Sequence, residues 1–132
     1  MFNSKSKANH LSIGARGEKA AVKYLKKCGY TISEINFFNP TGRRIGEIDI
    51  IARDGDEIVF IEVKSRTNTT FGQSLPEENI NRDKLYKLQK IASYYISKNK
   101  LFTTPHRFDA ISILAEPEKN IATLRHLKNI FI

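Results

Sequence analysis

Residues 46–66 read GEIDIIARDGDEIVFIEVKSR, and this stretch decides the fold. Two β-branched, apolar runs are separated by an Asp-Gly pair, which is a strong signal for a β-hairpin. Three charged residues interrupt the runs: Asp49 in the first, and Glu62 and Lys64 in the second. Charges on a strand that helices cover on both sides are costly unless they are paired or bind a metal ion. These three residues are therefore the first candidates for a functional site.

The register of the hairpin decides whether the two carboxylates meet. Side chains two apart on a strand share a face. With Asp54-Gly55 as a two-residue type I′ loop, Asp49 lies opposite Phe60 and diagonally from Glu62, about 7–8 Å away between Cα atoms. A four-residue loop keeps the carboxylates on one face, whereas a three-residue loop moves Asp49 to the other. A metal site therefore demands an even-numbered loop or a compensating bulge.

The rest of the chain predicts an α/β fold. Apolar residues at helical spacing indicate one helix from Ser12 to Gly29 and a second from about Arg82 to Lys98, capped by Asn81. Residues 65–79 are polar and predict a long surface loop. The predicted class is a central mixed β-sheet flanked by helices. Strands are expected at Tyr30–Phe38, in both arms of the hairpin, and at Arg107–Leu114 and Ile121–Leu127.

Length and composition limit the possible functions. The 132 residues suit one domain, which we place at 11–132 after a flexible tail at 1–10. Lys and Arg number 22 against 14 Asp and Glu, and the net charge of +8 favours a nucleic-acid partner. No apolar run approaches the roughly 18 residues that span a bilayer, so no membrane partner is expected. The only cysteine, Cys28, suits a reducing cytoplasm, and its spacing places it on the apolar stripe of the first helix.

Glu18 adds a fourth charged candidate from a different element. It precedes Ala21 and Val22 by three and four residues, so it falls on the apolar stripe of the first helix. One interpretation is that the helix dipole favours a negative charge in these first turns. The other is that Glu18 faces the charges of the hairpin as a further ligand or a water-orienting group. We prefer the second, because three charged residues are available for it to join.

Three segments together resemble a known family: GARGEKAAVKYLKKCGY, GEIDIIARDGDEIVFIEVKSR and HRFDAISI, which cover most of residues 14–113. Asp49 followed by Glu62-Val63-Lys64 on a hairpin, after a helical Glu, resembles the PD-(D/E)xK site of the restriction-endonuclease-like superfamily. The set is most similar to the YraN family, which is itself similar to archaeal-type Holliday junction resolvases. The proline before the superfamily's Asp is Ile48 here, which leaves the ligands unchanged.

The resemblance implies a restriction-endonuclease-like core and a metal-dependent endonuclease that hydrolyses phosphodiester bonds. DNA is the expected partner rather than RNA, and branched or junction DNA is the expected form. Asp49, Glu62, the Val63 carbonyl and Glu18 would hold Mg²⁺ or Mn²⁺. Lys64 would orient the attacking water or stabilise charge on the phosphate. A two-fold homodimer would suit a junction substrate.

Basic residues near the hairpin are candidates for contacts with the phosphate backbone, although a solvated surface role suits each of them equally. They are Arg43, Arg44, Arg66, Lys84 and Lys87. Two alternatives to an enzyme stay open. One is a nucleic-acid-binding or adaptor module that does not cut, and the other is a protein-interaction scaffold, which would not explain the net charge of +8. Asp109 is interpreted as a structural partner of Arg107 or of a helix.

Overall fold

The computed structural model describes residues 13–67 and 82–130. The predicted tail, the Asn81 cap and the greater part of the predicted loop lie outside the described residues. The expected order of helices and strands is confirmed. The elements are α2 (Ile13–Lys27), β1 (Thr31–Phe37), β2 (Ile48–Asp54), β3 (Glu57–Thr67), α3 (Arg82–Lys98), β4 (His106–Glu116), the short 3-10 helix η2 (Pro117–Lys119) and β5 (Ile121–Leu127). Since β3 continues to Thr67, the first residues of the predicted loop are strand.

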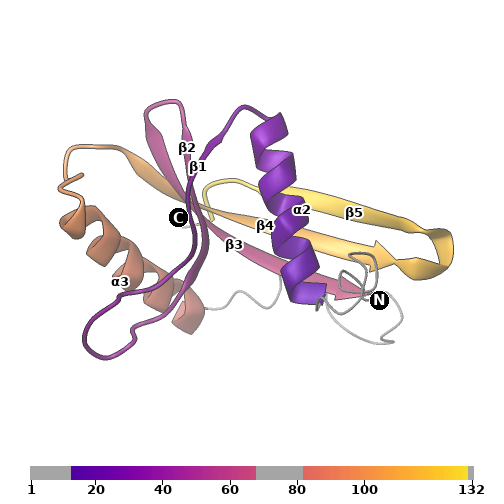
Figure 1. Cartoon of the computed structure of the whole chain (residues 1–132), viewed down its shortest axis with the longest axis horizontal. Coiled ribbons are helices and arrows are strands. Elements are labelled where there is room, and N and C mark those ends of the chain that lie inside the picture. The colour runs from indigo at the N-terminus through magenta and orange to yellow at the C-terminus, as the bar shows by residue number, and fades with distance from the viewer. Residues whose placement is uncertain (1–12, 68–81, 131–132) are drawn as a thin grey trace, which may run out of the picture.

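The five strands form one mixed sheet in the order β1-β2-β3-β4-β5. β3 and β4 run parallel, and the other neighbours are antiparallel. A parallel pair needs a crossover connection, which α3 supplies between β3 and β4. The two helices pack on different faces of the sheet (Figure 1). The predicted class of a mixed sheet flanked by helices is confirmed.

The hairpin has an even-numbered loop, but the predicted loop residues are wrong by one position. Asp54 pairs with Glu57, so Gly55 and Asp56 form the loop and the register moves by two residues. Within the turn only Gly55 has a positive φ, of 62°. A type II′ turn needs positive φ at its first central residue alone, whereas the predicted type I′ turn would impose it on Asp54 as well. The glycine therefore takes the first place in the loop.

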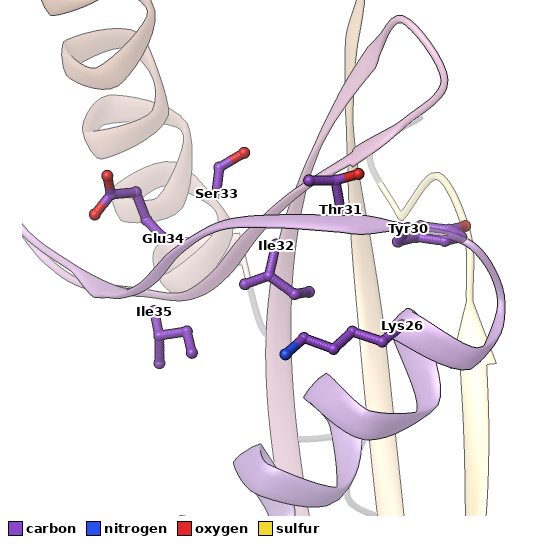
Figure 2. Close-up of a pocket in the computed structure, with 7 residues that line it drawn as sticks. All are labelled: Lys26, Tyr30, Thr31, Ile32, Ser33, Glu34 and Ile35. Atoms are coloured by element: carbon purple, nitrogen blue, oxygen red, sulfur yellow. The ribbon is translucent and has the colours of Figure 1, made fainter.

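β1 is less regular than its sequence predicts. Its pairing with β2 shifts between Ile32 and Glu34, which marks a bulge. Figure 2 shows the result: Ile32 and Ile35 point toward Lys26 at the end of α2, while Glu34 lies on the other side of the strand. Asn36 then adopts a φ of 53°, in the left-handed region that asparagine tolerates better than most residues. These two irregularities set the direction of the Asn36 side chain, which matters for the site.

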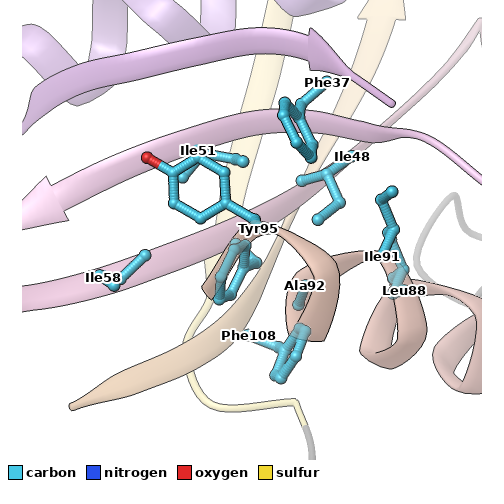
Figure 3. Close-up of a cluster of buried hydrophobic side chains, with 10 residues drawn as sticks. Phe37, Ile48, Ile51, Ile58, Leu88, Ile91, Ala92, Tyr95 and Phe108 are labelled. Carbon is cyan, nitrogen blue, oxygen red and sulfur yellow. The ribbon is translucent and has the colours of Figure 1, made fainter. Parts of the chain in front are cut away.

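Two apolar cores lie on the two faces of the sheet. On the α3 face the core is rich in aromatic rings, among them Phe37, Tyr95 and Phe108 (Figure 3). The Tyr95 ring meets Phe37 and Phe60 edge to face at centroid distances of 5.1 and 5.9 Å. On the α2 face, Ala21 and Leu25 are fully buried against branched strand residues. β3 contributes alternate residues to both cores, which explains its continuous apolar run. The charged residues Glu62 and Lys64 therefore come directly after a stretch of β3 that is covered on both faces.

A buried polar network ties β4 to the hairpin and to the end of the chain. Asp109 is fully buried, and its carboxylate accepts hydrogen bonds from Arg107 Nε at 3.0 Å and from the Asn129 amide at 3.0 Å. His126 Nε2 lies 2.7 Å from the same carboxylate. Burial alone would raise the pKa of Asp109, but the bonds from His126 and Arg107 hold it below its ordinary value. The predicted pairing of Asp109 with Arg107 is confirmed.

The prediction that Cys28 lies on an apolar stripe is wrong. The helix ends at Lys27, so the chain has turned away before the stripe reaches Cys28, and that side chain is exposed. Neither described helix is long and apolar enough to cross a membrane.

Gly17 allows α2 to lie close to β3, and its replacement tests this contact. A Cβ at Gly17 would overlap Ser65 Oγ and lie 3.1 Å from Ser65 Cβ. We expect Gly17→Ala to cost about 1–3 kcal/mol of unfolding free energy through overpacking, against a gain of about 1 kcal/mol from helix propensity. Urea unfolding measures the balance.

Ser65→Ala supplies the control for this prediction. Ser65 Oγ is buried and has no hydrogen-bond partner among the described residues, so removing it should leave stability unchanged or raise it slightly. In that background the cost of Gly17→Ala should fall by about 1 kcal/mol or more. A Gly17→Ala variant that gains stability with Ser65 present would contradict the proposed close approach.

Candidate active site

The carboxylates of Asp49 and Glu62 meet where the pairing of β2 with β3 ends. The last pair in that ladder is Ile50 with Ile61, and one further step sets Asp49 opposite Glu62. Asp49 Oδ2 accepts a hydrogen bond of 2.8 Å from the Val63 amide. At this point a side chain, and no longer the backbone of β2, is the hydrogen-bond partner of β3. Glu62 is only 5% exposed. The expectation that both carboxylates share one face is confirmed.

The surroundings make Asp49 a weak acid. Burial is the largest cause, and a hydrogen bond with Glu62 and the charge of that group add to it, so that the pKa of Asp49 rises to about 8. The Val63 amide and the Lys64 ammonium act in the opposite direction without cancelling the rise. At neutral pH Asp49 therefore retains its proton. This is the expected behaviour of a buried acid that lies beside a second carboxylate.

Two lysines face the carboxylate pair. Lys64 follows Glu62 by two residues on β3, and Lys84 lies in the first turn of α3 with its Nζ 3.9 Å from Glu62 Oε2. Burial is the largest cause of the lowered pKa of Lys84, and its contact with Lys64 lowers that pKa further. The contact of Lys84 with the phosphate backbone stays a prediction, and the structure places its ammonium at the carboxylates. Its position four residues before the buried Leu88 was the available signal, because that spacing shares a helix face.

Glu18 reaches the same place from α2. Desolvation is the largest cause of its raised pKa, and the charge of Asp49 is the second, so the two carboxylates lie within electrostatic range. A hydrogen bond with Asn36 lowers the pKa and holds Glu18 in place. Sequence reasoning missed Asn36, because its left-handed backbone lies inside a run that reads as a regular strand. The polar side chain between Ile35 and Phe37, in a run that reads as a strand, was the only signal.

The other basic candidates divide into two places. Arg43, Arg44 and Lys87 line one hollow, between the turn before β2 and the start of α3. Arg66 lines a different hollow, with Gly17 and Ser65. The hollow of Figure 2 is lined by Lys26 and residues 30–35, and none of the predicted site residues lies among them.

The donor set suits a small, hard cation. Mg²⁺ usually takes one or two protein carboxylates and completes its shell with water and substrate phosphate, and Asp49 and Glu62 can supply two. Over residues 13–67 and 82–130, no three His, Cys, Asp or Glu side chains are close enough together to hold a metal ion. Glu18 therefore belongs to the surroundings of the pair. The roles of Glu18 and of the Val63 carbonyl as ligands stay predictions.

The raised pKa of Asp49 predicts how the stability of the metal-free protein depends on pH. Because the folded state raises the pKa of Asp49 from 3.8 to about 8, its ionisation opposes folding, and this group's contribution should fall as pH rises across that range. Asp49→Asn keeps an acceptor for the Val63 amide and gains a donor toward Glu62. We expect it to raise the free energy of unfolding more at pH 9 than at pH 5, by at least about 1 kcal/mol.

Urea unfolding in the presence of a chelator measures this effect. Asp56→Asn is the matched control, because it removes the same charge from the exposed turn of the hairpin. An effect of Asp49→Asn on stability that is equal at both pH values would contradict the raised pKa of Asp49.

Comparison with known proteins places the chain among bacterial relatives of similar length. The model of the uncharacterised protein family UPF0102 matches residues 17–113, a range that contains Glu18 and the whole hairpin. A UPF0102 protein of Thermodesulfovibrio yellowstonii is 46% identical and covers 92% of this chain and 96% of its own length. A UPF0102 protein of Clostridioides difficile is 44% identical and covers 93% of this chain and 99% of its own length. A UPF0102 protein of Caldanaerobacter subterraneus is 42% identical and covers 95% of this chain and 98% of its own length. The chain belongs to the UPF0102 family, the YraN-like group that its motifs resemble.

Proposed function

We propose that this protein is a metal-dependent endonuclease that hydrolyses phosphodiester bonds in DNA. One observation carries the proposal: the carboxylates of Asp49 and Glu62 meet where the pairing of β2 with β3 ends, and Glu62 is only 5% exposed there. A fold gains no stability from placing two acids together on covered strands, since each loses its hydration and repels the other. A divalent cation that replaces the proton would remove both costs.

The chain's own residues suit the rest of the reaction. A bound Mg²⁺ or Mn²⁺ would lower the pKa of a water molecule and offset charge on the phosphate. Lys64, on the same face as Glu62, can orient the water or donate hydrogen bonds to the phosphate oxygens as charge develops there. Lys84 brings a second ammonium to the same side of the pair. Glu18, held by Asn36, can accept a hydrogen bond from a water beside Asp49.

Charge and motif resemblance support DNA as the substrate. The net charge of +8 favours a polyanion, and Arg43, Arg44 and Lys87 gather in one hollow, with Lys87 one helical turn along α3 from Lys84. The PD-(D/E)xK resemblance favours a restriction-endonuclease-like enzyme and, through the resolvases, branched or junction DNA. A homodimer in a reducing cytoplasm belongs to the same proposal.

A second candidate has one observation in its favour. Lys84 and Lys64 already bring positive charge to the carboxylates, with Lys84 Nζ at 3.9 Å from Glu62, so the cluster can be neutralised in part without a metal ion. In that case the protein binds nucleic acid as an adaptor and does not cut it.

Cleavage of labelled flapped, branched and single-stranded DNA with Mg²⁺ or Mn²⁺ separates the candidates. We expect the wild type to cut and Asp49→Asn and Lys64→Ala to lose at least about a hundredfold in rate, because each removes a group that acts in the transition state. Asp56→Asn and Lys98→Ala are matched controls on exposed surface and should cut at the wild-type rate.

Two results would reject the nuclease proposal. One is a wild-type protein that cuts none of these substrates with either metal ion. The other is cleavage at equal rates by the wild type and by both site variants. DNA binding that survives the substitutions and weakens steeply with salt would support the adaptor instead.

A further inference from the structure

The hollow lined by Arg43, Arg44 and Lys87 has features that the proposed reaction does not use. It holds about 330 Å³ and lies between the turn before β2 and the first turns of α3. The turn approaches the helix closely at Gly46, where an added Cβ would lie 3.7 Å from the Lys87 Cβ. The lining of the hollow includes four cations, one aromatic ring and one aliphatic side chain: Arg43, Arg44, Lys87, Lys90, Tyr86 and Ile45. We call this hollow the Tyr86 groove.

Aromatic rings and cations are interleaved in this part of the surface. The Tyr86 ring is half exposed, and Lys90 Nζ lies 5.0 Å from its centroid. In the turn before β2, the Phe38 ring is 45% exposed and Arg44 Cζ lies 4.3 Å from its centroid. Large rings exposed among cations are the pattern with which proteins bind single strands: bases stack on the rings, and cations follow the phosphates.

The groove keeps a positive balance after its ion pairs are counted. Two of the four cations have carboxylate partners, Arg44 with Glu47 at 2.8 Å and Lys87 with Asp83 at 3.4 Å. Both pairs are largely exposed, so each contributes little and can exchange its carboxylate for a phosphate. The surface therefore suits a polyanion.

We propose that the Tyr86 groove binds a single-stranded segment of nucleic acid, with one unpaired base stacked on the Tyr86 ring and the adjoining phosphates at the groove's cations. A duplex offers the groove only its phosphates, because its bases are already stacked on one another. The proposal rests on the proposed nuclease function and deepens it, because Lys84 at the carboxylates and Lys87 in the groove are neighbours one helical turn apart on α3. The substrate class is then a nucleic acid with an unpaired base beside the cleaved bond.

Fluorescence anisotropy with labelled oligonucleotides tests the groove without requiring cleavage. The probes are a single-stranded DNA and a blunt duplex of the same length, in a buffer with a chelator. We expect Tyr86→Ala to weaken binding of the single strand by about 5- to 100-fold, the range of one stacked base, and to change duplex binding less than about twofold. Tyr86→Phe keeps the ring and should bind as the wild type does.

Phe102→Ala is the matched control, because Phe102 is 70% exposed on the turn between α3 and β4 and does not line the groove. It should bind both probes as the wild type does. Equal losses on both probes in Tyr86→Ala would reduce Tyr86 to a general contact and overturn the proposal. Unchanged binding of the single strand in that variant, or its equal weakening in Phe102→Ala, would also overturn it.

The two proposals fail separately. If the protein prefers the single strand through Tyr86 but cuts no substrate, the groove proposal stands and the nuclease proposal is rejected. Cleavage that depends on Asp49, together with binding that ignores Tyr86, would keep the nuclease and reject the groove.

Discussion

The contact between the Asp49 and Glu62 carboxylates is the constraint on which the rest of the site depends. It occurs where the backbone ladder between β2 and β3 stops, and Asp49 then accepts the Val63 amide with its side chain. The sheet thereby opens between two strands that are covered on both faces. Burial, and then the neighbouring Glu62, raise the pKa of Asp49 to about 8, and a divalent cation bound by both carboxylates would offset these costs.

The surrounding elements can be understood as supports for this pair. α3 brings Lys84 to it from one face of the sheet, and α2 brings Glu18 toward it from the other. The bulge and the left-handed Asn36 in β1 hold Glu18, and Gly17 lets α2 lie close enough to β3. Away from the site, Arg107, which pairs with Asp109, also donates hydrogen bonds to Asp54 and Glu57 of the hairpin, so the strand that carries Glu62 is fixed to its neighbour β4.

Much of this was predictable from the sequence, because hydrophobic period and turn chemistry are local. The second helix and the last strand were predicted at their observed bounds, and the inward-facing Glu18 followed from its helical phase. The hairpin loop was misplaced by one residue, since Asp54-Gly55 and Gly55-Asp56 are both turn pairs and only backbone torsion decides between them. Asn36 and the inward position of Lys84 depend on how distant segments pack, so a polar residue in a strand and the helical spacing of Lys84 to Leu88 were only weak signals for them.

The direct test of the central claim is the number of protons released when a divalent cation binds. Calorimetric titration of Mn²⁺ in two buffers that differ in ionisation enthalpy gives this number. With the pKa of Asp49 at about 8, binding at pH 7 should release about one proton per ion, and binding at pH 9.5 should release almost none. Binding that releases no proton at pH 7, or no binding at either pH, would contradict the account of Asp49 and Glu62 as a cation site.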